Sequence, residues 1–300
     1  MPHRPPPSPA QRSSAKFTSQ VLRVLTTASN TAMRARDATW IDAYLEEGFA
    51  CIRGVFSRAE IAELRRYFDE VLDRATGLRE VTKCGLAEFR VVPIAGVPTL
   101  KFAKWAASFH RSLDRFRTAP GLLSLAIELL GPDLRQITNQ MHWKNPCDEV
   151  SFQMHQDCTF RKPDSAYRNL SRSFLQTAIA VDPCSEANGC IEFVPRSHRE
   201  AKALLAGGYE GWEANVVNRA VLERFAPAVP ALLDPGDVVI WNPFTIHGSE
   251  PNRSRVSRRL YINGFARAAD CDHGILVTEG GKVLPLAWGP RTRWDVVEER

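Results

Sequence analysis

The chain has 300 residues, 44% of them hydrophobic and 24% charged, which is typical of a globular protein with a substantial core. Its net charge of +5 arises in residues 1–36, which hold six basic and no acidic side chains and leave about −1 for the rest. This distribution argues against a nucleic-acid-binding body, and no apolar run approaches the roughly 20 residues of a membrane span.

The N-terminal segment is predicted to be a flexible basic arm rich in Pro and Ser, covering residues 1–38, because the opening run "PHRPPPSPAQRSS" cannot form a core. Residues 39–300 are predicted to form a single domain. The seven cysteines are an odd number and contain no C-x-x-C pair, so a reduced, cytoplasmic setting is expected. The acid-free arm also has the composition of an organelle transit peptide, so a mitochondrial or other organellar location is the alternative.

The first structured part of the chain is predicted to be helical. A short helix should end at Gly48 and lead into a strand. A longer amphipathic helix over residues 57–77 has a capping box made by Ser57 and Glu60. Its expected buried stripe is Ile61, Leu64, Phe68, Val71 and Leu72. A second helix starts at Pro120 and stops before Gly131.

From about residue 134 the sequence changes to short β-like runs separated by turn residues. These runs are expected over residues 135–144, 150–160, 173–183, 188–198, 230–243, 245–250 and 258–267. Helices followed by many short strands predict a mostly β fold with buttressing helices, a double-stranded β-helix or jelly-roll barrel of the cupin-like kind.

Two histidines and one aspartate in this β region are the candidate metal ligands. In "FQMHQDCTF" a strand would project His155 and Asp157 from the same face. For that pair alone, a buried core histidine hydrogen-bonded to a neighbouring aspartate is the favoured interpretation. His247, which follows Asp157 by 90 residues, supplies a third ligand. Two histidines and one carboxylate form the facial triad of non-haem Fe(II) sites, which leaves coordination positions open.

The β region resembles the phytanoyl-CoA dioxygenase family of Fe(II)- and 2-oxoglutarate-dependent oxygenases over roughly residues 41–267. The resemblance is carried by "HQD" at 155–157, "NGCIEFVPRSH" at 188–198, "GDVVIWNPFTIHGSEPNRS" at 236–254 and an arginine eleven residues after His247. It implies an oxygenase that uses dioxygen and 2-oxoglutarate to oxidise a small organic molecule and releases succinate and carbon dioxide.

The same resemblance implies roles for individual residues. The Fe(II) ligands would be His155, Asp157 and His247. Arg258 would bind the distal carboxylate of 2-oxoglutarate, with Ser249 as a second contact. Gln140 and His142 share a strand face that the resemblance places beside 2-oxoglutarate, although a structural role explains them equally well.

Two departures and two alternatives remain open at this point. The departures are that Arg196 replaces the glycine of the family's P-G-S-H turn, and that the ectoine-hydroxylase signature around His155 and Asp157 is absent, which disfavours that substrate. Asp157 is present where halogenating members carry a small residue, which implies hydroxylation or another oxidation. The alternatives are a metal-binding jelly-roll protein that does not use 2-oxoglutarate, and a non-catalytic binding module. Strand alternation groups Arg258 with Leu260 and Ile262, so Arg258 rather than Arg259 should face the barrel interior.

Overall fold

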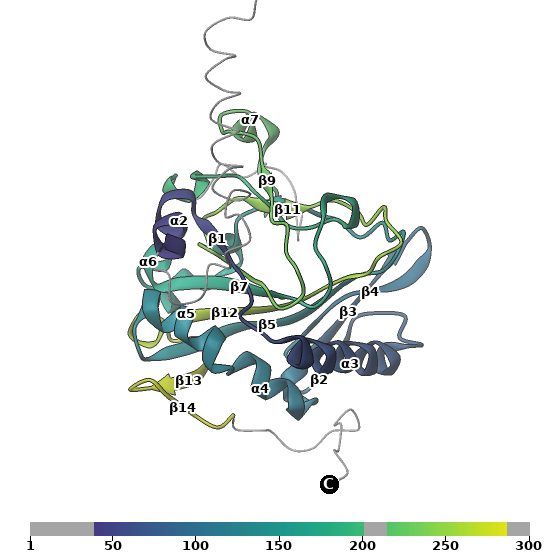
Figure 1. The fold of residues 1–300 in the computed structure, drawn as a ribbon, viewed down its shortest axis with the longest axis horizontal. Coiled ribbons are helices and arrows are strands. Elements are labelled where there is room, and N and C mark those ends of the chain that lie inside the picture. Colours follow the sequence, from purple (N-terminus) through teal and green to yellow (C-terminus); the bar gives the residue numbers. More distant parts are fainter. Residues whose placement is uncertain (1–38, 201–214, 287–300) are drawn as a thin grey trace, which may run out of the picture.

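A computed structural model of the chain describes residues 39–200 and 215–286 (Figure 1). The arm predicted for residues 1–38 lies outside the described residues, as does the C-terminal end of the predicted domain. Both boundaries therefore stay predictions. No helix among the described residues combines the length and the apolar character needed to cross a membrane.

The described chain opens with the helices and strand that the sequence predicts. Helix α2 (Thr39–Glu47) ends at Gly48, whose φ of +88° favours glycine, and strand β1 (Phe49–Ile52) follows. Helix α3 (Arg58–Ala75) then packs on the sheet. Its predicted stripe is buried except at Leu72, which is only partly covered, while Tyr67 and Ala75 are buried instead.

The N-terminus of α3 carries the predicted capping box. The Ser57 hydroxyl accepts a hydrogen bond from the Glu60 backbone, and the Glu60 carboxylate accepts one of 2.7 Å from the Ser57 backbone. Two backbone donors that the first helical turn would otherwise leave without partners are thereby satisfied.

The larger sheet is antiparallel, and its strands run in the order β1-β10-β7-β12-β5-β4-β3-β2, with β13 beside β5 and β14 beside β13. The strands not yet located are β2 (Thr82–Cys84), β3 (Ala87–Ile94), β4 (Val97–Lys104), β5 (Leu134–Lys144), β7 (Phe174–Ala180), β10 (Val238–Trp241), β12 (Arg258–Arg267), β13 (Ile275–Glu279) and β14 (Lys282–Val283). The sequence interpretation had assigned no strand to the segment that forms β2, β3 and β4, because the predicted β region began only near residue 134. This segment forms the far edge of the sheet by pairing β4 with β5.

The smaller sheet faces the larger one and runs in the order β6-β11-β8-β9. Its strands are β6 (Phe152–His155), β11 (His247–Ser249), β8 (Glu192–Phe193) and β9 (Val229–Pro230). Phe193 of this sheet stacks on Phe49 of the larger sheet with ring centroids 4.6 Å apart. The two sheets therefore enclose an interior between them, as the predicted jelly-roll barrel requires.

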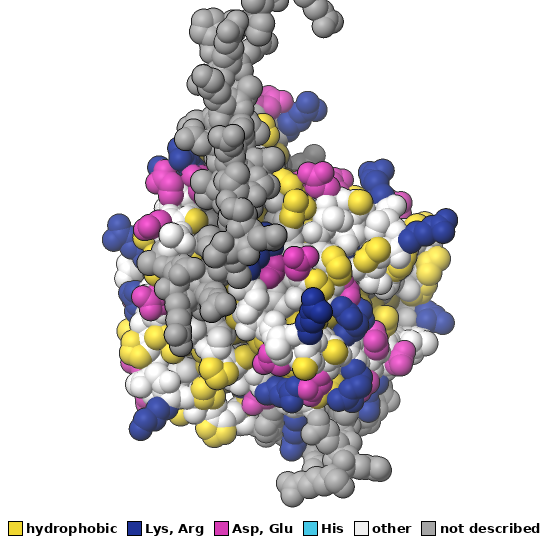
Figure 2. All heavy atoms as spheres, viewed as in Figure 1, with side chains coloured by type: hydrophobic (Ala, Val, Ile, Leu, Met, Phe, Trp, Pro, Cys, Tyr) yellow, Lys and Arg dark blue, Asp and Glu magenta, His cyan; other side chains and the backbone are white. Residues whose placement is uncertain are grey.

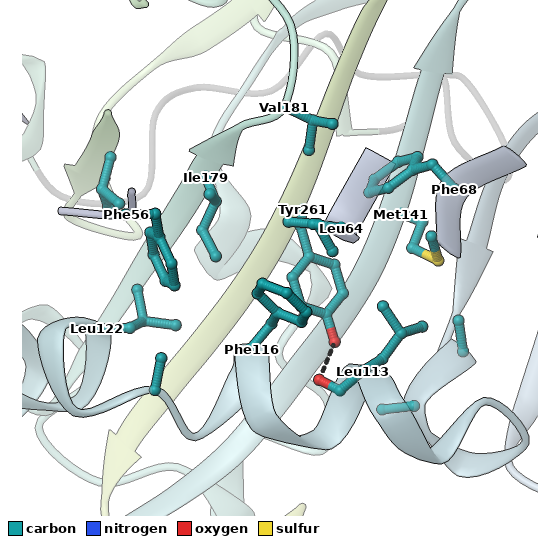
Figure 3. Close-up of a cluster of buried hydrophobic side chains, with 14 of the residues drawn as sticks. Phe56, Leu64, Phe68, Leu113, Phe116, Leu122, Met141, Ile179, Val181 and Tyr261 are labelled. Atoms are coloured by element: carbon teal, nitrogen blue, oxygen red, sulfur yellow. Dashed lines mark hydrogen bonds between the residues drawn. The ribbon is translucent and has the colours of Figure 1, made fainter. Parts of the chain in front are cut away.

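Helices cover the outer face of the larger sheet. Figure 1 shows α3, α4 (Asp114–Arg117) and α5 (Pro120–Leu130) on this side, while the short helices α6 (Leu170–Ser173) and α7 (Arg219–Leu222) lie elsewhere. Figure 3 shows the core between helices and sheet, where Phe116 and Leu122 meet Ile179 and Tyr261. The Tyr261 hydroxyl donates a hydrogen bond of 3.4 Å to the Leu113 carbonyl at this interface.

Strand alternation assigns the side chains of the larger sheet to two faces. Met141, Ile179 and Tyr261 belong to the core under the helices, whereas Ala178 and Leu260 belong to the cluster between the sheets. The even-numbered residues of β7 and β12 therefore face the barrel interior, as do those of β5 from Thr138 onward, where a bulge shifts the register.

The charged surface has no single sign on the face seen in Figure 2, where basic and acidic side chains are interspersed. This agrees with the near-neutral charge of the chain beyond residue 36. Arg196, which replaces the family's glycine, has a φ of +66° in the left-handed region that favours glycine, and its guanidinium forms ion pairs with Glu46 and Glu47. The ion pairs hold a conformation that costs an arginine more than a glycine.

Candidate active site

The three predicted metal ligands lie together between the two sheets. One ligand atom each from His155, Asp157 and His247 lies within 4.8 Å of the others. All three side chains are buried. The pairing of β6 with β11 places His155 directly opposite His247, which explains how residues far apart in the sequence meet.

The position of Asp157 corrects the sequence interpretation. Strand β6 ends at His155, and Asp157 begins a 3-10 helix, Asp157–Phe160, so the two ligands do not share one strand face. The turn after His155 brings Asp157 back toward both histidines, with Oδ1 3.9 Å from His155 Nε2 and Oδ2 3.7 Å from His247 Nε2.

Each histidine presents its Nε2 to the centre because its Nδ1 hydrogen-bonds to a backbone carbonyl. His155 Nδ1 lies 2.7 Å from the Gln153 oxygen, and His247 Nδ1 lies 2.9 Å from the Thr245 oxygen. A carbonyl only accepts, so Nδ1 carries the proton in both rings and Nε2 holds a lone pair. Burial, together with the nearby His247, lowers the pKa of His155 to about 4, which keeps that ring neutral at neutral pH.

Two side chains from the larger sheet hold the Asp157 carboxylate. Gln176 Nε2 and Trp241 Nε1 donate hydrogen bonds of 3.1 and 2.8 Å to Oδ2. Burial opposes ionisation of Asp157, but the neighbouring histidines, Arg161 and the Trp241 hydrogen bond hold its pKa below the usual value. The carboxylate is therefore ionised and oriented. Two imidazoles that present Nε2 and one carboxylate fit the donor set of a non-haem Fe(II) site.

The ligands open into a pocket of about 500 Å³ between the sheets, and Arg258 lines the same pocket. The Arg258 side chain is only 2% exposed, and its Nε donates a hydrogen bond of 3.2 Å to the Gly189 carbonyl. Within residues 39–200 and 215–286, no carboxylate forms an ion pair with it. A buried guanidinium without a counter-ion is costly, so the pocket is suited to an anion.

Arg259 points to the opposite face, as the alternation of β12 predicts. Its guanidinium donates to both carboxylate oxygens of Asp182, at 2.7 and 2.9 Å, and to Asp69 at 2.6 Å. These ion pairs connect β12 with α3 on the helix-covered side.

Ser249, Gln140 and His142 also line the pocket. His142 Nε2 lies 2.8 Å from Gln140 Oε1. Burial and the nearby cations lower the pKa of His142 well below its usual value, so the neutral ring donates from Nε2 to that oxygen. The Gln140 amide nitrogen is thereby turned away from the histidine and available to a ligand.

Lys144 is a buried amine that the sequence interpretation did not single out. It pairs with Arg258 in the β5–β12 register, and its Nζ donates to Ser249 Oγ at 2.8 Å and to the Gly189 and Glu250 carbonyls. Burial and the nearby Arg258 lower the pKa of Lys144 to about 6. Because Ser249 accepts from Lys144, its own hydroxyl hydrogen can be donated into the pocket.

The sequence offers a pocket position for Trp241 only as the alternative to a core position. Sequence reasoning did not assign four residues to the site: Gln176, Trp241, Lys144 and Arg161. The signal that could have found the first three is strand alternation, since each shares a face with residues already assigned to the interior. Arg161 follows the 3-10 helix, where no strand periodicity applies.

The comparisons with known proteins agree with this geometry. The family model described as phytanoyl-CoA dioxygenase (PhyH) matches residues 44–260. The chain is 28% identical over 206 residues to the dioxygenase lolE1 of Epichloe uncinata, covering 67% of this chain and 74% of that protein. It is 25% identical over 228 residues to a probable alpha-ketoglutarate-dependent hypophosphite dioxygenase of Stutzerimonas stutzeri, covering 75% and 77%.

A solved structure confirms the predicted jelly-roll fold. The crystal structure of EctD from S. alaskensis with bound Fe superposes with a TM-score of 0.64 at 17% identity, covering 82% of each chain. At this identity the likeness concerns the fold.

Proposed function

The chain belongs to the phytanoyl-CoA dioxygenase family, and from this premise we propose that His155, Asp157 and His247 hold its Fe(II) ion and that Arg258 binds 2-oxoglutarate. The protein is a non-haem Fe(II)- and 2-oxoglutarate-dependent dioxygenase that oxidises a small organic molecule. With 2-oxoglutarate and dioxygen, bound Fe(II) supplies the oxidising chemistry, in which succinate and carbon dioxide are released.

The side chains of this protein bind and orient the reactants. Arg258 offers a guanidinium fork to the distal carboxylate of 2-oxoglutarate. Ser249, held by Lys144, donates a second hydrogen bond to the same group. The Gln140 amide, held by His142, faces the body of the co-substrate. The surrounding barrel excludes water from these contacts, which strengthens them.

The observation that carries this proposal is the buried Arg258 guanidinium in the same pocket as the triad, with no described carboxylate paired to it. A metal-binding jelly-roll protein without a co-substrate would have no need for a desolvated cation there. The observation favours 2-oxoglutarate binding over a metal-binding jelly-roll protein that does not use it, and turnover separates an enzyme from a non-catalytic binding module.

The test is an anaerobic titration of 2-oxoglutarate into the Fe(II)-loaded protein, followed by its visible charge-transfer absorption. We expect one Fe(II) per chain, saturable binding of 2-oxoglutarate, and slow succinate formation when oxygen is admitted. The variant His155→Ala should lose the iron and the absorption together. If wild-type protein binds iron but no 2-oxoglutarate, the metal-binding alternative is correct; if it binds both and never forms succinate, the non-catalytic alternative is correct.

A further inference from the structure

With Fe(II) bound, the pocket holds more positive charge than Asp157 and 2-oxoglutarate can neutralise. Its described lining residues include four cations, Arg90, Lys104, Arg161 and Arg258, and one carboxylate, Asp157. Resting on the function proposed above, we propose that the primary substrate is an organic anion, a carboxylate or a phosphorus or sulfur oxyanion, and that the guanidinium of Arg161 binds its charged group.

Arg161 is built into the wall of the pocket. It follows the 3-10 helix that starts at Asp157, and its guanidinium lies over the Phe174 ring, 4.6 Å from the ring centre. One terminal nitrogen donates to Thr138 Oγ1 at 3.0 Å. The Phe174 ring and the Thr138 hydroxyl hold the planar group in one orientation, which reduces the entropy lost when it binds a ligand.

The hydrogen-bonding capacity of Arg161 is not used up by the described residues. Its Nε is buried without an acceptor. In the described parts of the chain no carboxylate forms an ion pair with Arg161. Burial lowers the pKa of Arg161, and the nearby negative charge of Asp157 opposes this effect. A guanidinium donor buried without an acceptor is destabilising, so the site is suited to a ligand that supplies one.

The co-substrate alone does not account for these cations. One carboxylate of 2-oxoglutarate is assigned to Arg258 and the other lies at the metal, so that Fe(II) and the dianion cancel in charge. Lys104 forms an ion pair of 3.3 Å with Glu88. Three cations remain, and the single negative charge of Asp157 compensates one of them, which leaves two positive charges. Among the described residues neither Arg90 nor Arg161 has an ion-pair partner.

The strand register separates Arg161 from the co-substrate end. Arg258 pairs with Lys144 at the end of β5, whereas the hydrogen-bond partner of Arg161 is Thr138, six residues earlier on the same strand. Six residues of strand span roughly 20 Å. Arg161 is thus anchored toward the other end of the pocket, where a substrate has room.

The remaining lining suits the body of such a substrate. Phe102, Trp105, Phe160 and Ile137 give this pocket apolar walls. Apolar walls with a few fixed polar groups are the usual form of a small-molecule site. The expected substrate therefore has an apolar body and an anionic group.

The test compares probes of equal length and different charge: hexanoate, hexylphosphonate, hexanol and hexylamine. Binding to the anaerobic Fe(II)-loaded protein is measured by calorimetry at constant ionic strength, with and without saturating 2-oxoglutarate. We expect both acids to bind at least about tenfold more tightly than hexanol, the gain typical of one charge-assisted hydrogen-bonded pair, and hexylamine to bind most weakly.

Variants locate the anion site. Arg161→Gln should abolish the preference for acids and leave the dissociation constant of 2-oxoglutarate within about twofold of wild type, whereas Arg161→Lys should restore part of the preference. Arg168→Gln removes an exposed arginine that pairs with Asp272 away from the pocket, so it should bind every probe as wild type does. Thermal melts of each variant check the fold.

Several outcomes would overturn this inference while leaving the proposed function intact. In each of them 2-oxoglutarate binds normally. Either the protein shows no preference for acids, or it binds no probe at all, or its preference for acids survives Arg161→Gln. If Arg161→Gln weakens 2-oxoglutarate binding as much as Arg258→Ala does, Arg161 binds the co-substrate, and the proposed anion site for the primary substrate is also wrong. If 2-oxoglutarate fails to bind, the proposed function fails, and the titrations made without it still measure anion preference.

Discussion

Two adjacent arginines at the start of β12 have opposite surroundings. Arg258 is buried in the pocket without a carboxylate partner among the described residues, while Arg259 pairs with Asp182 and Asp69 on the outer face. As residue types in the sequence, the two arginines are indistinguishable. The pleat of one strand separates a ligand-binding residue from a structural one.

Arg258→Ala should raise the dissociation constant of 2-oxoglutarate by two orders of magnitude or more, because losing the partner of a buried charge costs about 3–5 kcal/mol. Arg259→Ala should leave that constant unchanged but lower the free energy of unfolding by about 1–3 kcal/mol, since the buried Asp182 loses the two guanidinium hydrogen bonds of Arg259. Titrations with 2-oxoglutarate give the dissociation constants of both variants, and chemical denaturation gives their free energies of unfolding. If Arg259→Ala weakens 2-oxoglutarate binding and Arg258→Ala does not, the assignment of Arg258 to the pocket is wrong.

The tryptophan that supports Asp157 offers a second residue-level test. Trp241→Phe removes the Nε1 donor and keeps most of the ring, so Fe(II) affinity should fall by about 10–100-fold, as is usual when the partner of a metal ligand is lost. The matched control is Trp143→Phe, because Trp143 is equally buried and its Nε1 has no hydrogen-bond partner among the described residues. Equal iron affinity for both variants, measured by competition with a chelator, would contradict a role for Trp241 in holding the carboxylate.

At the scale of elements, the site depends on how closely β12 approaches its neighbours. Gly264 of β12 pairs with Gln176 of β7 and with Thr138 of β5. A Cβ atom at this position would lie 2.2 Å from Gln176 Oε1 and 2.9 Å from the Thr138 side chain. The glycine thus leaves the space in which Gln176 reaches Asp157.

Gly264→Ala should therefore displace Gln176, lower the free energy of unfolding by about 1–3 kcal/mol through overpacking, and weaken Fe(II) binding. The double variant Gly264→Ala, Gln176→Ala removes the clash with Gln176 and leaves the close contact with Thr138, so its stability should recover in part while its iron affinity stays low. Denaturation curves and iron titrations check both. A single variant that binds iron as tightly as wild type would exclude this coupling between β12 and the metal ligand.

At the scale of the whole molecule, both sheets and every residue assigned to the site lie within residues 39–200 and 215–286. The basic N-terminal segment contributes none of them. The site is assembled where the two sheets face each other, with the metal ligands supplied by β6, β11 and the turn after β6.

Deletion of residues 1–36 should leave the melting temperature and the iron stoichiometry unchanged, because this segment has the composition of a chain that forms no core. Differential scanning calorimetry of the shortened and full-length proteins, both loaded with iron, makes the comparison. A loss of several degrees on deletion would show that the segment packs against the domain.

The sequence by itself determined the chemistry of the metal site and the class of fold. His155, Asp157 and His247 are recognisable from residue type and from motifs that resemble the family, and Arg258 from its spacing after His247 in that resemblance and from strand alternation. The capping box of Ser57 and Glu60 is a local pattern that can be read directly from the sequence. These features depend on neighbours in the chain, or on motifs whose residues must keep fixed spacings.

The tertiary structure alone decided what surrounds those residues. Asp157 leaves the strand for a 3-10 helix, Gln176 and Trp241 converge on it from β7 and β10, and Arg161 turns into the pocket over Phe174. None of this follows from local propensity, because each contact is set by the register between strands far apart in the sequence. Register depends on the packing of the complete core, and therefore it appears only when the two sheets are in place.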